Sequence, residues 1–310
     1  MADKNANHTL RGNLLLLLTA LIWGIAFVAQ KEGGAEMGAL TFNGVRSLLG
    51  GGMLVVLLPL LDRVGLSHRP STPQEKKALW VGGLLCGLAL FAATNLQQIG
   101  LNFNQFGMEE TTAGKGGFIT ALYIVLVPLF GLIIGRRTTL FTWLGVVLAV
   151  VGLYFLCMQG EGGIVPGDLL VLACAPIFSI QILLVDKYSP QTDGVRLACI
   201  EFFTVGILNI PLMFIFESPS LTTMVSCWES VLYAGLLSSG VAYTLQIVAQ
   251  KDTHPTTASL LMSLESVFAV LAGIVVLGDV MTDWEIIGCV VMFAAIVLAQ
   301  LPTPKKKEVL

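Results

Sequence analysis

The sequence has little charge for its length. Only 12% of its 310 residues are Asp, Glu, Lys or Arg, about half the share found in soluble domains. Hydrophobic residues make up 55% of the chain, and its mean hydropathy is +0.83. A water-soluble fold of this length could not hide so much apolar surface, because even large domains keep a polar exterior. The composition therefore predicts an all-α integral membrane protein with the lipid bilayer as its solvent.

Patterns typical of metal sites and disulfides are also missing. The six cysteines show no CxxC spacing, and five of them fall inside or at the ends of apolar runs, where cysteine behaves as a small hydrophobe. The three histidines lie in polar segments between those runs, which argues against a buried metal site. We therefore expect no metal ion, no other cofactor and no structural disulfide.

Motifs of several other function classes are absent. No GxxxxGK[ST] phosphate loop is present, so the chain is not expected to use ATP directly. No HExxH motif or Ser/His/Asp constellation indicates a membrane hydrolase, and no ladder of arginines indicates a voltage sensor. These absences weigh against an enzyme, and we expect no nucleic-acid partner.

The chain does contain a series of apolar runs, each close to the roughly 20 residues that a transmembrane helix needs. Breaks rich in Pro, Gly, Ser or charge separate them, as at residues 69–73 and 253–255. The runs predict ten spans, near residues 12–30, 40–61, 78–97, 111–135, 139–157, 168–186, 196–216, 228–249, 256–278 and 284–301.

The placement of lysine and arginine gives these spans an orientation. With the N-terminus in the cytoplasm, the cytoplasmic segments hold fourteen Lys and Arg residues and the opposite side holds only Lys31. The remaining two, Arg46 and Lys115, fall within spans. Under the positive-inside rule this bias predicts ten spans with both termini inside.

The two halves of the chain share a faint pattern, seen when residues 12–50 are laid over 167–205 without gaps. In this overlay Trp23-Gly24 matches Phe178-Ser179 and Arg46 matches Glu201. Further along the chain, Leu96-Gln97 matches Leu245-Gln246 and Thr111-Thr112-Ala113 matches Thr256-Thr257-Ala258. Each half contains five spans, an odd number, so the second half must be inserted upside down. The chain is thus predicted to be two inverted five-helix repeats, residues 1–157 and 158–310, with a substrate site between them near the membrane midplane.

Three segments carry a resemblance to a known family. They are Trp23-Gly24 in the first span, residues 111–120 (TTAGKGGFIT) opening the fourth, and residues 263–268 (SLESVF) with Leu277-Gly278-Asp279 in the ninth. With ten spans and a tandem repeat, they resemble the EamA-like family of the drug/metabolite transporter (DMT) superfamily. Asp279 stands where the family usually has Glu. The resemblance implies a secondary exporter or exchanger of small metabolites such as amino acids, in the inner cell membrane, but it selects no substrate.

Ionisable groups inside apolar spans cost roughly 2.5 kcal/mol or more at the bilayer centre, so they are candidate functional residues. Glu265 lies near mid-depth of its span, where it could bind a substrate amine, couple transport to protons, or tie its span to a neighbouring helix. Lys115 could bind a substrate carboxylate or an acidic residue, or it could reach the lipid headgroups. Arg46 and Glu201 occupy equivalent repeat positions with opposite charges. They are either a salt bridge that breaks during transport or separate interfacial anchors, and their expected depths favour anchors.

Polar and aromatic residues inside the spans complete a predicted substrate site. Trp23 and Phe178 are too deep for an interfacial belt and would form two facing aromatic walls, suited to a small amphipathic or aromatic solute. Ordinary packing with interhelical hydrogen bonds is the commoner fate of such residues. The predicted substrate-binding residues are Trp23, Asn95, Gln98, Lys115, Phe118, Phe178, Gln181, Tyr243, Gln246 and Glu265, with Glu265 also the candidate for proton coupling.

Two classes of function remain. The first is a secondary transporter that works by alternating access of spans one to five against spans six to ten. Its partners would be a small-molecule substrate, the lipid bilayer and protons as candidate coupling ions. The alternative is a membrane-embedded enzyme acting on a lipid-linked substrate, for which the short loops leave little room. Nothing in the sequence demands more than a monomer.

Overall fold

The computed structural model describes residues 2–111, 113–136, 138–157, 164–277, 282–299 and 301, and among these it contains helices and no strand. The first half of the chain forms α1 (Ala2–Met37), α2 (Ala39–Arg63), α3 (Pro73–Leu101), the 3-10 turn η1 (Phe103–Phe106), α4 (Ala113–Ala121), α5 (Tyr123–Ile133) and α6 (Leu140–Cys157).

The second half contains a longer list of shorter elements, because one of its spans is partly a π-helix. It forms α7 (Pro166–Tyr188), the 3-10 turn η2 (Ser189–Gln191), α8 (Gly194–Phe216), α9 (Leu221–Ser226), α10 (Trp228–Leu232), the π-helix η3 (Tyr233–Ala242), α11 (Tyr243–Ala249), α12 (Pro255–Met262), α13 (Glu265–Leu277) and α14 (Asp283–Ala299).

Local sequence signals fix several helix starts. At α3, the Thr72 side chain accepts from the Glu75 amide at 3.1 Å while the Glu75 carboxylate accepts from the Thr72 amide, which is a capping box. At α8, the Asp193 carboxylate caps the helix by accepting from the Arg196 amide at 2.8 Å. Proline stands at the first position of α3, where its missing N–H costs nothing.

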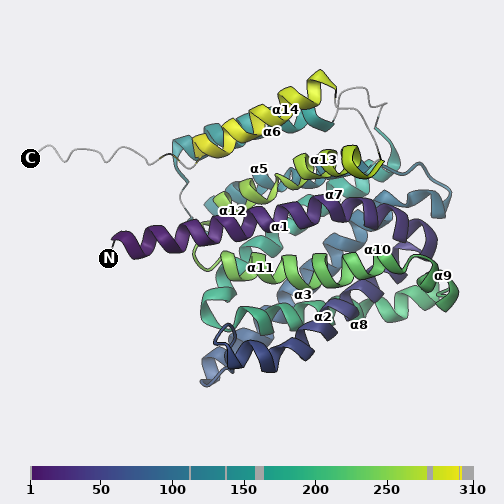
Figure 1. Ribbon diagram of the computed structural model, residues 1–310, viewed down its shortest axis with the longest axis horizontal. Helices are drawn as coiled ribbons and strands as arrows, with labels where there is room; N and C mark the ends of the chain where they lie inside the picture. The colour runs from purple at the N-terminus through teal and green to yellow at the C-terminus, as the bar shows by residue number, and fades with distance from the viewer. Residues whose placement is uncertain are drawn as a thin grey trace, which may run out of the picture.

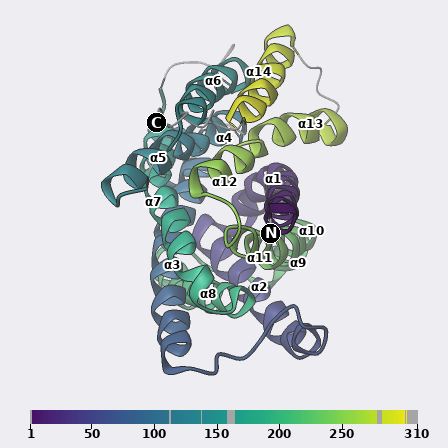
Figure 2. The ribbon, with the colours of Figure 1, turned by 90° about the vertical axis from the view of Figure 1, so that its left-hand side faces the viewer.

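The helices lie roughly parallel or antiparallel in a bundle, seen from two sides in Figures 1 and 2. The α6–α14 pair runs along one edge and the α2–α8 pair along the opposite edge, with α1, α3, α7 and the η3–α11 segment between them. α3 packs on α7 and α8, and α1 packs on α13 and η3. The main packing partners of each half therefore come from the other half.

Eight helical segments of the described chain are long and apolar enough to cross a membrane. They are Thr9–Met37, Ala39–Arg63, Pro73–Leu101, Lys115–Ile133, Pro166–Gln191, Gly194–Phe216, Trp228–Ala249 and Pro255–Ala272. Two shorter apolar helices, Leu140–Phe155 and Ile286–Ala299, occupy the positions of the predicted fifth and tenth spans. All ten predicted runs thus overlap apolar helices, and the number of spans stays a prediction because two of them are short.

The exterior of the bundle carries large apolar side chains that are open to the surroundings. Val56, Ile133 and Val275 are 76%, 82% and 84% exposed. Exposed apolar area on this scale suits contact with lipid hydrocarbon, which neither donates nor accepts hydrogen bonds. Polar side chains such as Gln98, Glu201 and Ser263 are instead buried inside the bundle, so the polarity of this protein is concentrated in its interior.

Candidate functional site

A small cavity of about 40 Å³ lies among helices of both halves. The first half lines it with Trp23, Phe27, Gln30, Arg46, Gln97, Thr120 and Tyr123, and the second half with Phe178, Gln181, Ile182, Ser238, Tyr243, Gln246, Met262 and Glu265. A volume of this size holds only a few water molecules. Any larger solute would therefore need the surrounding helices to move apart.

Two helices that approach the cavity are interrupted there. Between α4 and α5, the Leu122 amide bonds to the Ile119 carbonyl at 3.2 Å, and between α12 and α13 the Leu264 amide bonds to the Leu261 carbonyl at 3.3 Å. Bonds to the third preceding residue tighten the helix into a 3-10 turn at each joint. Irregular backbone at membrane depth is tolerated where it is buried in protein or lines a cavity, and both joints meet that condition.

The first residues after the two interruptions contact each other. The Tyr123 hydroxyl, at the start of α5, donates to Oε1 of Glu265, at the start of α13, over 3.1 Å. Both side chains are buried. A carboxylate in the first turn of α13 also interacts favourably with the positive end of that helix. The interruptions thus place one carboxylate and one phenol at the wall of the cavity.

Gly24 brings α1 into close contact with α13 beside Glu265. A Cβ atom at Gly24 would lie 2.5 Å from Cβ of Phe268 and 2.7 Å from the Glu265 carbonyl oxygen, so a larger residue does not fit without a shift of α13. The preceding Trp23 packs its ring against Tyr243, with centroids 4.5 Å apart. Its buried indole N–H has no partner among the described residues. Trp23 therefore forms part of the cavity wall, while Gly24 allows α1 and α13 to cross closely.

The interpretation of Arg46 and Glu201 as interfacial anchors is wrong. Arg46 is 4% exposed and lines the cavity from α2. Glu201 is fully buried on α8, where its Oε1 accepts from Gln181 Nε2 at 2.8 Å. An anchor would reach the headgroups, whereas the packing of α2 and α8 against the other half encloses both side chains.

Six of the ten predicted substrate-binding residues line the cavity: Trp23, Phe178, Gln181, Tyr243, Gln246 and Glu265. Gln181 and Gln246 are linked, since Gln246 Nε2 lies 3.4 Å from Gln181 Oε1. The second oxygen of Glu201, behind Gln181, and the amide oxygen of Gln246 have no hydrogen-bond partner among the described residues. The second half thus presents a chain of amides and a carboxylate with unused hydrogen-bonding capacity.

Two of the remaining four predicted residues hold neighbouring helices instead of facing the cavity. Asn95 accepts from the Asn43 amide at 2.9 Å. Gln98 donates to the Gln30 carbonyl and to the Asn102 side chain, both at 2.7 Å, and so ties α3 to α1. These contacts place Asn95 and Gln98 one layer behind the cavity wall.

The other two, Lys115 and Phe118, belong to α4. Lys115 forms a buried ion pair with Asp168 at the start of α7, with Nζ and Oδ2 2.6 Å apart. This fits the alternative in which the lysine meets an acidic residue, and it joins the two halves of the chain. Phe118 packs against the main hydrophobic core. Neither side chain lines the cavity.

Six polar residues of the cavity were not among those predicted to bind substrate: Gln30, Arg46, Gln97, Thr120, Tyr123 and Ser238. The repeat pattern could have selected Gln97, because it aligns with Gln246. Arg46 stood out as a charge inside a span, but the direction of its side chain depends on how α2 packs. Gln30 and Tyr123 carry no signal in the sequence.

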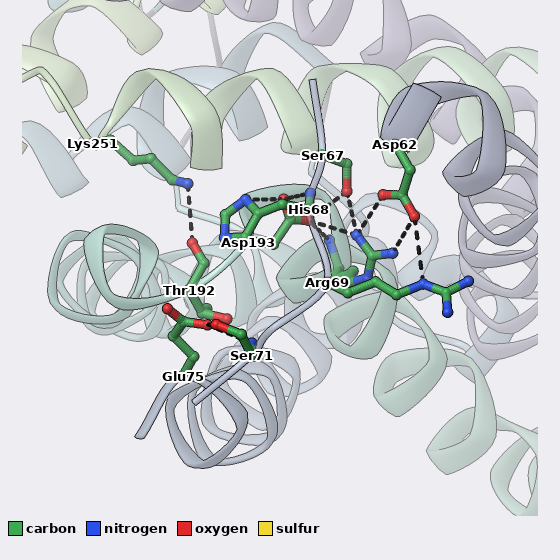
Figure 3. Close-up of polar contacts among 10 residues, drawn as sticks. Asp62, Ser67, His68, Arg69, Ser71, Glu75, Thr192, Asp193 and Lys251 are labelled. Atoms are coloured by element: carbon green, nitrogen blue, oxygen red, sulfur yellow. Dashed lines mark hydrogen bonds and ion pairs between the residues drawn. The ribbon is translucent and has the colours of Figure 1, made fainter. Parts of the chain in front are cut away.

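A polar cluster joins the two halves at the end of the bundle that holds the N-terminus (Figure 1). Arg196, in the first turn of α8, donates to both oxygens of Asp62, near the end of α2, at 2.9 and 2.8 Å. Asp193 accepts from the Ser67 hydroxyl and from the His68 amide, both at 2.9 Å (Figure 3). The loop between α2 and α3 is thereby fastened to the start of α8.

A second carboxylate joins the same two helices at their other ends. Glu217, which directly follows α8, accepts from the Leu40 amide at 2.9 Å and from the Thr41 amide and hydroxyl at 2.7 and 2.6 Å. It caps α2, whose first amides would otherwise be unsatisfied. Each of the antiparallel helices α2 and α8 is therefore fastened at its start by a carboxylate from the end of the other.

The model of the EamA-like transporter family matches the chain twice, over residues 10–158 and 165–301. The chain belongs to the EamA-like transporter family. As a member with eight long apolar helical segments among its described residues, it is a multi-pass membrane protein.

Relatives of this EamA-like protein are named transporters. An uncharacterized transporter of Archaeoglobus fulgidus is 30% identical over 300 residues, which cover 94% of this chain and 86% of the relative. The uncharacterized inner membrane transporter YedA of Escherichia coli is 26% identical, over 91% of this chain and 88% of the relative. The threonine/homoserine exporter RhtA of Salmonella typhimurium is 27% identical over 52% of this chain and 54% of its own.

A solved crystal structure shares the fold. It superposes with a TM-score of 0.74, covers 93% of this chain and 96% of its own, and is 19% identical in sequence. At that identity the likeness concerns the fold alone.

Proposed function

We propose that this EamA-like protein is a secondary transporter that exports or exchanges small metabolites such as amino acids. The observation that carries this proposal is the cavity, which both halves line with a cation, a carboxylate, amides and aromatic rings. Ionisable groups buried at membrane depth mark substrate and ion pathways. The named relatives are transporters, and one of them is an exporter of threonine and homoserine.

The mechanism we propose is alternating access between two inverted repeats. The overlay of residues 12–50 on 167–205 places Thr41 on Arg196, and its continuation places Asp62 on Glu217. The contact of Asp62 with Arg196 and the contact of Glu217 with Thr41 are then the same contact, once at each end of the α2–α8 pair. A two-fold axis in the membrane plane would produce this reciprocity.

The packing of the other helices supports the same symmetry. In the two repeats α1 corresponds to α7, α3 to η3–α11, α4–α5 to α12–α13, and α6 to α14. The packing of α1 on α13 therefore corresponds to the packing of α7 on α4 and α5, and both contacts are present. The packing of α3 on α7 likewise corresponds to that of η3 and α11 on α1, and the α6–α14 pair corresponds to itself. The two interrupted spans, α4–α5 and α12–α13, correspond as well.

We propose that the end of the bundle bearing the N-terminus faces the cytoplasm, with ten spans and both termini inside an inner membrane. Arg69 and Lys251 lie in the cluster of Figure 3, at that end, and Arg196 joins it by donating to Asp62. Basic residues favour the cytoplasmic side during insertion. A monomer contains all the elements that the cavity needs.

Solute contact is proposed for the six predicted residues that line the cavity and for Arg46, with Glu265 as the coupling group. Asn95 and Gln98 would act by holding α2 and α1 in place. Lys115 would hold the two halves together through Asp168, and Phe118 would support α4 by packing. Because the cavity is smaller than an amino acid, transport requires the helices around it to move apart on one side at a time.

The test is transport by the purified protein in proteoliposomes. Efflux and counterflow would be measured with a mixed pool of amino acids and other small metabolites, with and without a pH gradient. We expect saturable exchange of a few solutes, driven to accumulation by the gradient. Absence of flux for every solute, from protein shown to be folded, would contradict the proposal and favour an enzyme or another class of substrate.

A further inference from the structure

We infer that Arg46 is the binding site for a carboxylate of the solute, and that the transported solute is a zwitterion whose ammonium group lies at Glu265. This inference rests on the proposed function and specifies its substrate. From the sequence alone Arg46 was interpreted as an interfacial anchor and not as a carboxylate site, because a charge near the predicted end of a span can reach the lipid headgroups.

The first observation is that the guanidinium group of Arg46 is buried but makes a single hydrogen bond to the described residues. Its Nε donates to Oδ1 of Asn43 at 2.9 Å, and its carbon lies 5.8 Å from the centre of the Phe42 ring. The two terminal nitrogens donate to no residue that the structure describes, although Arg46 is 4% exposed and lines the cavity. A guanidinium presents these nitrogens as a planar fork that matches both oxygens of a carboxylate.

The second observation is that the fork is held in position before any solute arrives. The Asn43 amide that orients Arg46 donates to the Thr94 carbonyl and to Oδ1 of Asn95, both at 2.9 Å, so α3 fixes it. The fully buried ring of Phe42 also lies beside the guanidinium group. Such preorganisation lowers the entropic cost of binding an anion.

The third observation is that neither acidic residue near the cavity pairs with Arg46. Glu265 accepts from the Tyr123 hydroxyl at 3.1 Å, and Glu201 accepts from Gln181 at 2.8 Å. Arg46 forms no ion pair with any residue in the described part of the chain. A buried cation without an anionic partner is costly, so the site gains most from a ligand that brings the anion.

The cavity also limits what that ligand can be. Glu265 lines the same small space as Arg46, so a dianion such as phosphate would be repelled by the carboxylate. A solute with one carboxylate and one ammonium group would instead neutralise both residues. The rings of Trp23, Phe178 and Tyr243 are then left to contact its side chain. An α-amino acid has this combination of groups.

The experiment compares amino acids with their amides, which keep the ammonium group and lose the carboxylate. Each of the twenty protein L-amino acids would be tested for thermal stabilisation of the purified protein in nanodiscs and for counterflow in proteoliposomes. Those that bind would be compared with their primary amides, for example L-threonine with L-threoninamide. We expect the amide to bind roughly tenfold to hundredfold more weakly, as for loss of a charged hydrogen-bonded pair.

Variants then assign the effect to Arg46. Arg46→Gln should bind acid and amide equally, at about the affinity of the wild type for the amide, and Arg46→Lys should keep part of the preference. Lys77→Gln removes one positive charge from an exposed position of α3 and should discriminate like the wild type. If Arg46→Gln does not fold, the partial preference expected of Arg46→Lys assigns the effect, and equal binding of acid and amide by the wild type would still overturn the carboxylate site.

The outcomes separate this inference from the proposed function. Transport of acid and amide with equal efficiency, or discrimination that survives in Arg46→Gln, would overturn the carboxylate site and leave the transporter intact. Stabilisation by amino acids that Arg46→Gln abolishes, without any flux, would keep the site and refute transport. If none of the twenty amino acids stabilises the protein or exchanges, the zwitterion assignment is wrong, and the wider metabolite pool tests the function alone.

Discussion

At the scale of single residues, Glu265 lies both at the start of a helix and at the wall of the cavity. It opens α13, where its charge suits the helix end, and its carboxylate reaches the cavity beside Tyr123. A solute that enters the cavity as proposed would contact Glu265 beside the Tyr123 hydroxyl, so the carboxylate could bind or release a proton as the solute enters and leaves. We therefore regard Glu265 as the residue through which a proton gradient acts.

Replacement of Glu265 by glutamine tests this role. Glutamine keeps the size of the side chain and can accept from Tyr123, but it cannot release a proton. If one proton is exchanged per solute, the wild type should accumulate solute about tenfold for each unit of pH difference. In Glu265→Gln we expect no gradient-driven accumulation, while counterflow at equal pH persists with weaker binding. The measurement is solute uptake by proteoliposomes at a series of imposed pH gradients.

The matched control is Glu229→Gln, which neutralises an exposed carboxylate at the start of α10 and should retain the full dependence on pH. Unchanged pH dependence in Glu265→Gln would remove Glu265 from the coupling mechanism.

Gly24 offers a second prediction at the residue scale. In Gly24→Ala the new methyl group would lie 2.8 Å from the Ala269 amide as well as against Phe268, so α13 must move away from α1. Overpacking of this kind costs about 1–3 kcal/mol, and it would displace Glu265 together with α13. We expect lower thermal stability in detergent and slower transport.

Gly52→Ala serves as the comparison for Gly24→Ala. It also lies inside a helix, but a Cβ there would meet no atom within 4 Å. Because alanine favours the helix over glycine by up to about 1 kcal/mol, this variant should be as stable as the wild type or slightly more stable. Equal melting temperatures for the two variants would contradict the close approach of α1 and α13.

At the scale of elements, α2 and α8 behave as one unit because both ends of the pair are fastened. Arg196 and Asp62 join them at the end near the N-terminus, and Glu217 and Thr41 join them at the other. A transport cycle that opened the bundle between these two helices would break several charged hydrogen bonds at once. We expect the moving contacts to lie elsewhere, between this pair and the interrupted helices.

The Asp62 carboxylate allows a test with an internal control, because two arginines approach it. Arg196 is 13% exposed and donates two bonds of 2.8 and 2.9 Å, whereas Arg69 is 88% exposed and lies 3.8 Å away. We expect Arg196→Gln to lower the free energy of unfolding by about 1–3 kcal/mol, as for loss of charge-assisted hydrogen bonds. Arg69→Gln should change it by no more than about 0.5 kcal/mol, since exposed pairs contribute little. The stability of the two variants would be compared by thermal unfolding in the same detergent. Equal losses of stability in Arg196→Gln and Arg69→Gln would show that the cluster does not fasten the helices.

At the scale of the whole molecule, each half buries its helices mainly against the other half. α3 packs on α7, α2 on α8, α1 on α13 and α6 on α14. Neither half has a complete set of packing partners of its own, so we expect the first half expressed alone to be unstable. The cavity exists only where the halves meet, which is the geometry that alternating access requires.

Reporter fusions test the proposed arrangement of ten spans in the membrane. A reporter active only outside the cytoplasm should be active when fused after residue 107 or 220, and inactive after residue 69, 251 or 310. A protein in which only the eight long segments cross would keep residues 69 and 310 inside and residue 107 outside, but it would place residue 220 inside and residue 251 outside. The fusions after residues 220 and 251 therefore distinguish ten spans from eight. Activity after residue 69 with none after residue 107 would overturn the orientation.

Much of the candidate site could be predicted from the sequence, because burial of polar residues in a membrane protein follows from the cost of placing them in lipid. Gln181, Gln246 and Glu265 were selected on that ground, and all line the cavity. The same reasoning could not separate Gln97 from Gln98, since a one-residue step turns the side chain by about 100° around the helix axis. It could not assign Lys115 either, whose partner Asp168 lies on a distant segment.

The sequence by itself determined that this protein is helical, crosses the membrane many times and belongs to a transporter family, because hydrophobic runs, charge placement and local motifs are properties of contiguous residues. The tertiary structure decided which polar groups share the cavity, because that depends on the crossing and rotation of helices remote in the chain. Arg46 shows the difference most clearly. Its charge was visible in the sequence, but only the packing of α2 against α3 and α8 turned it into the cavity, with no partner for its terminal nitrogens among the described residues.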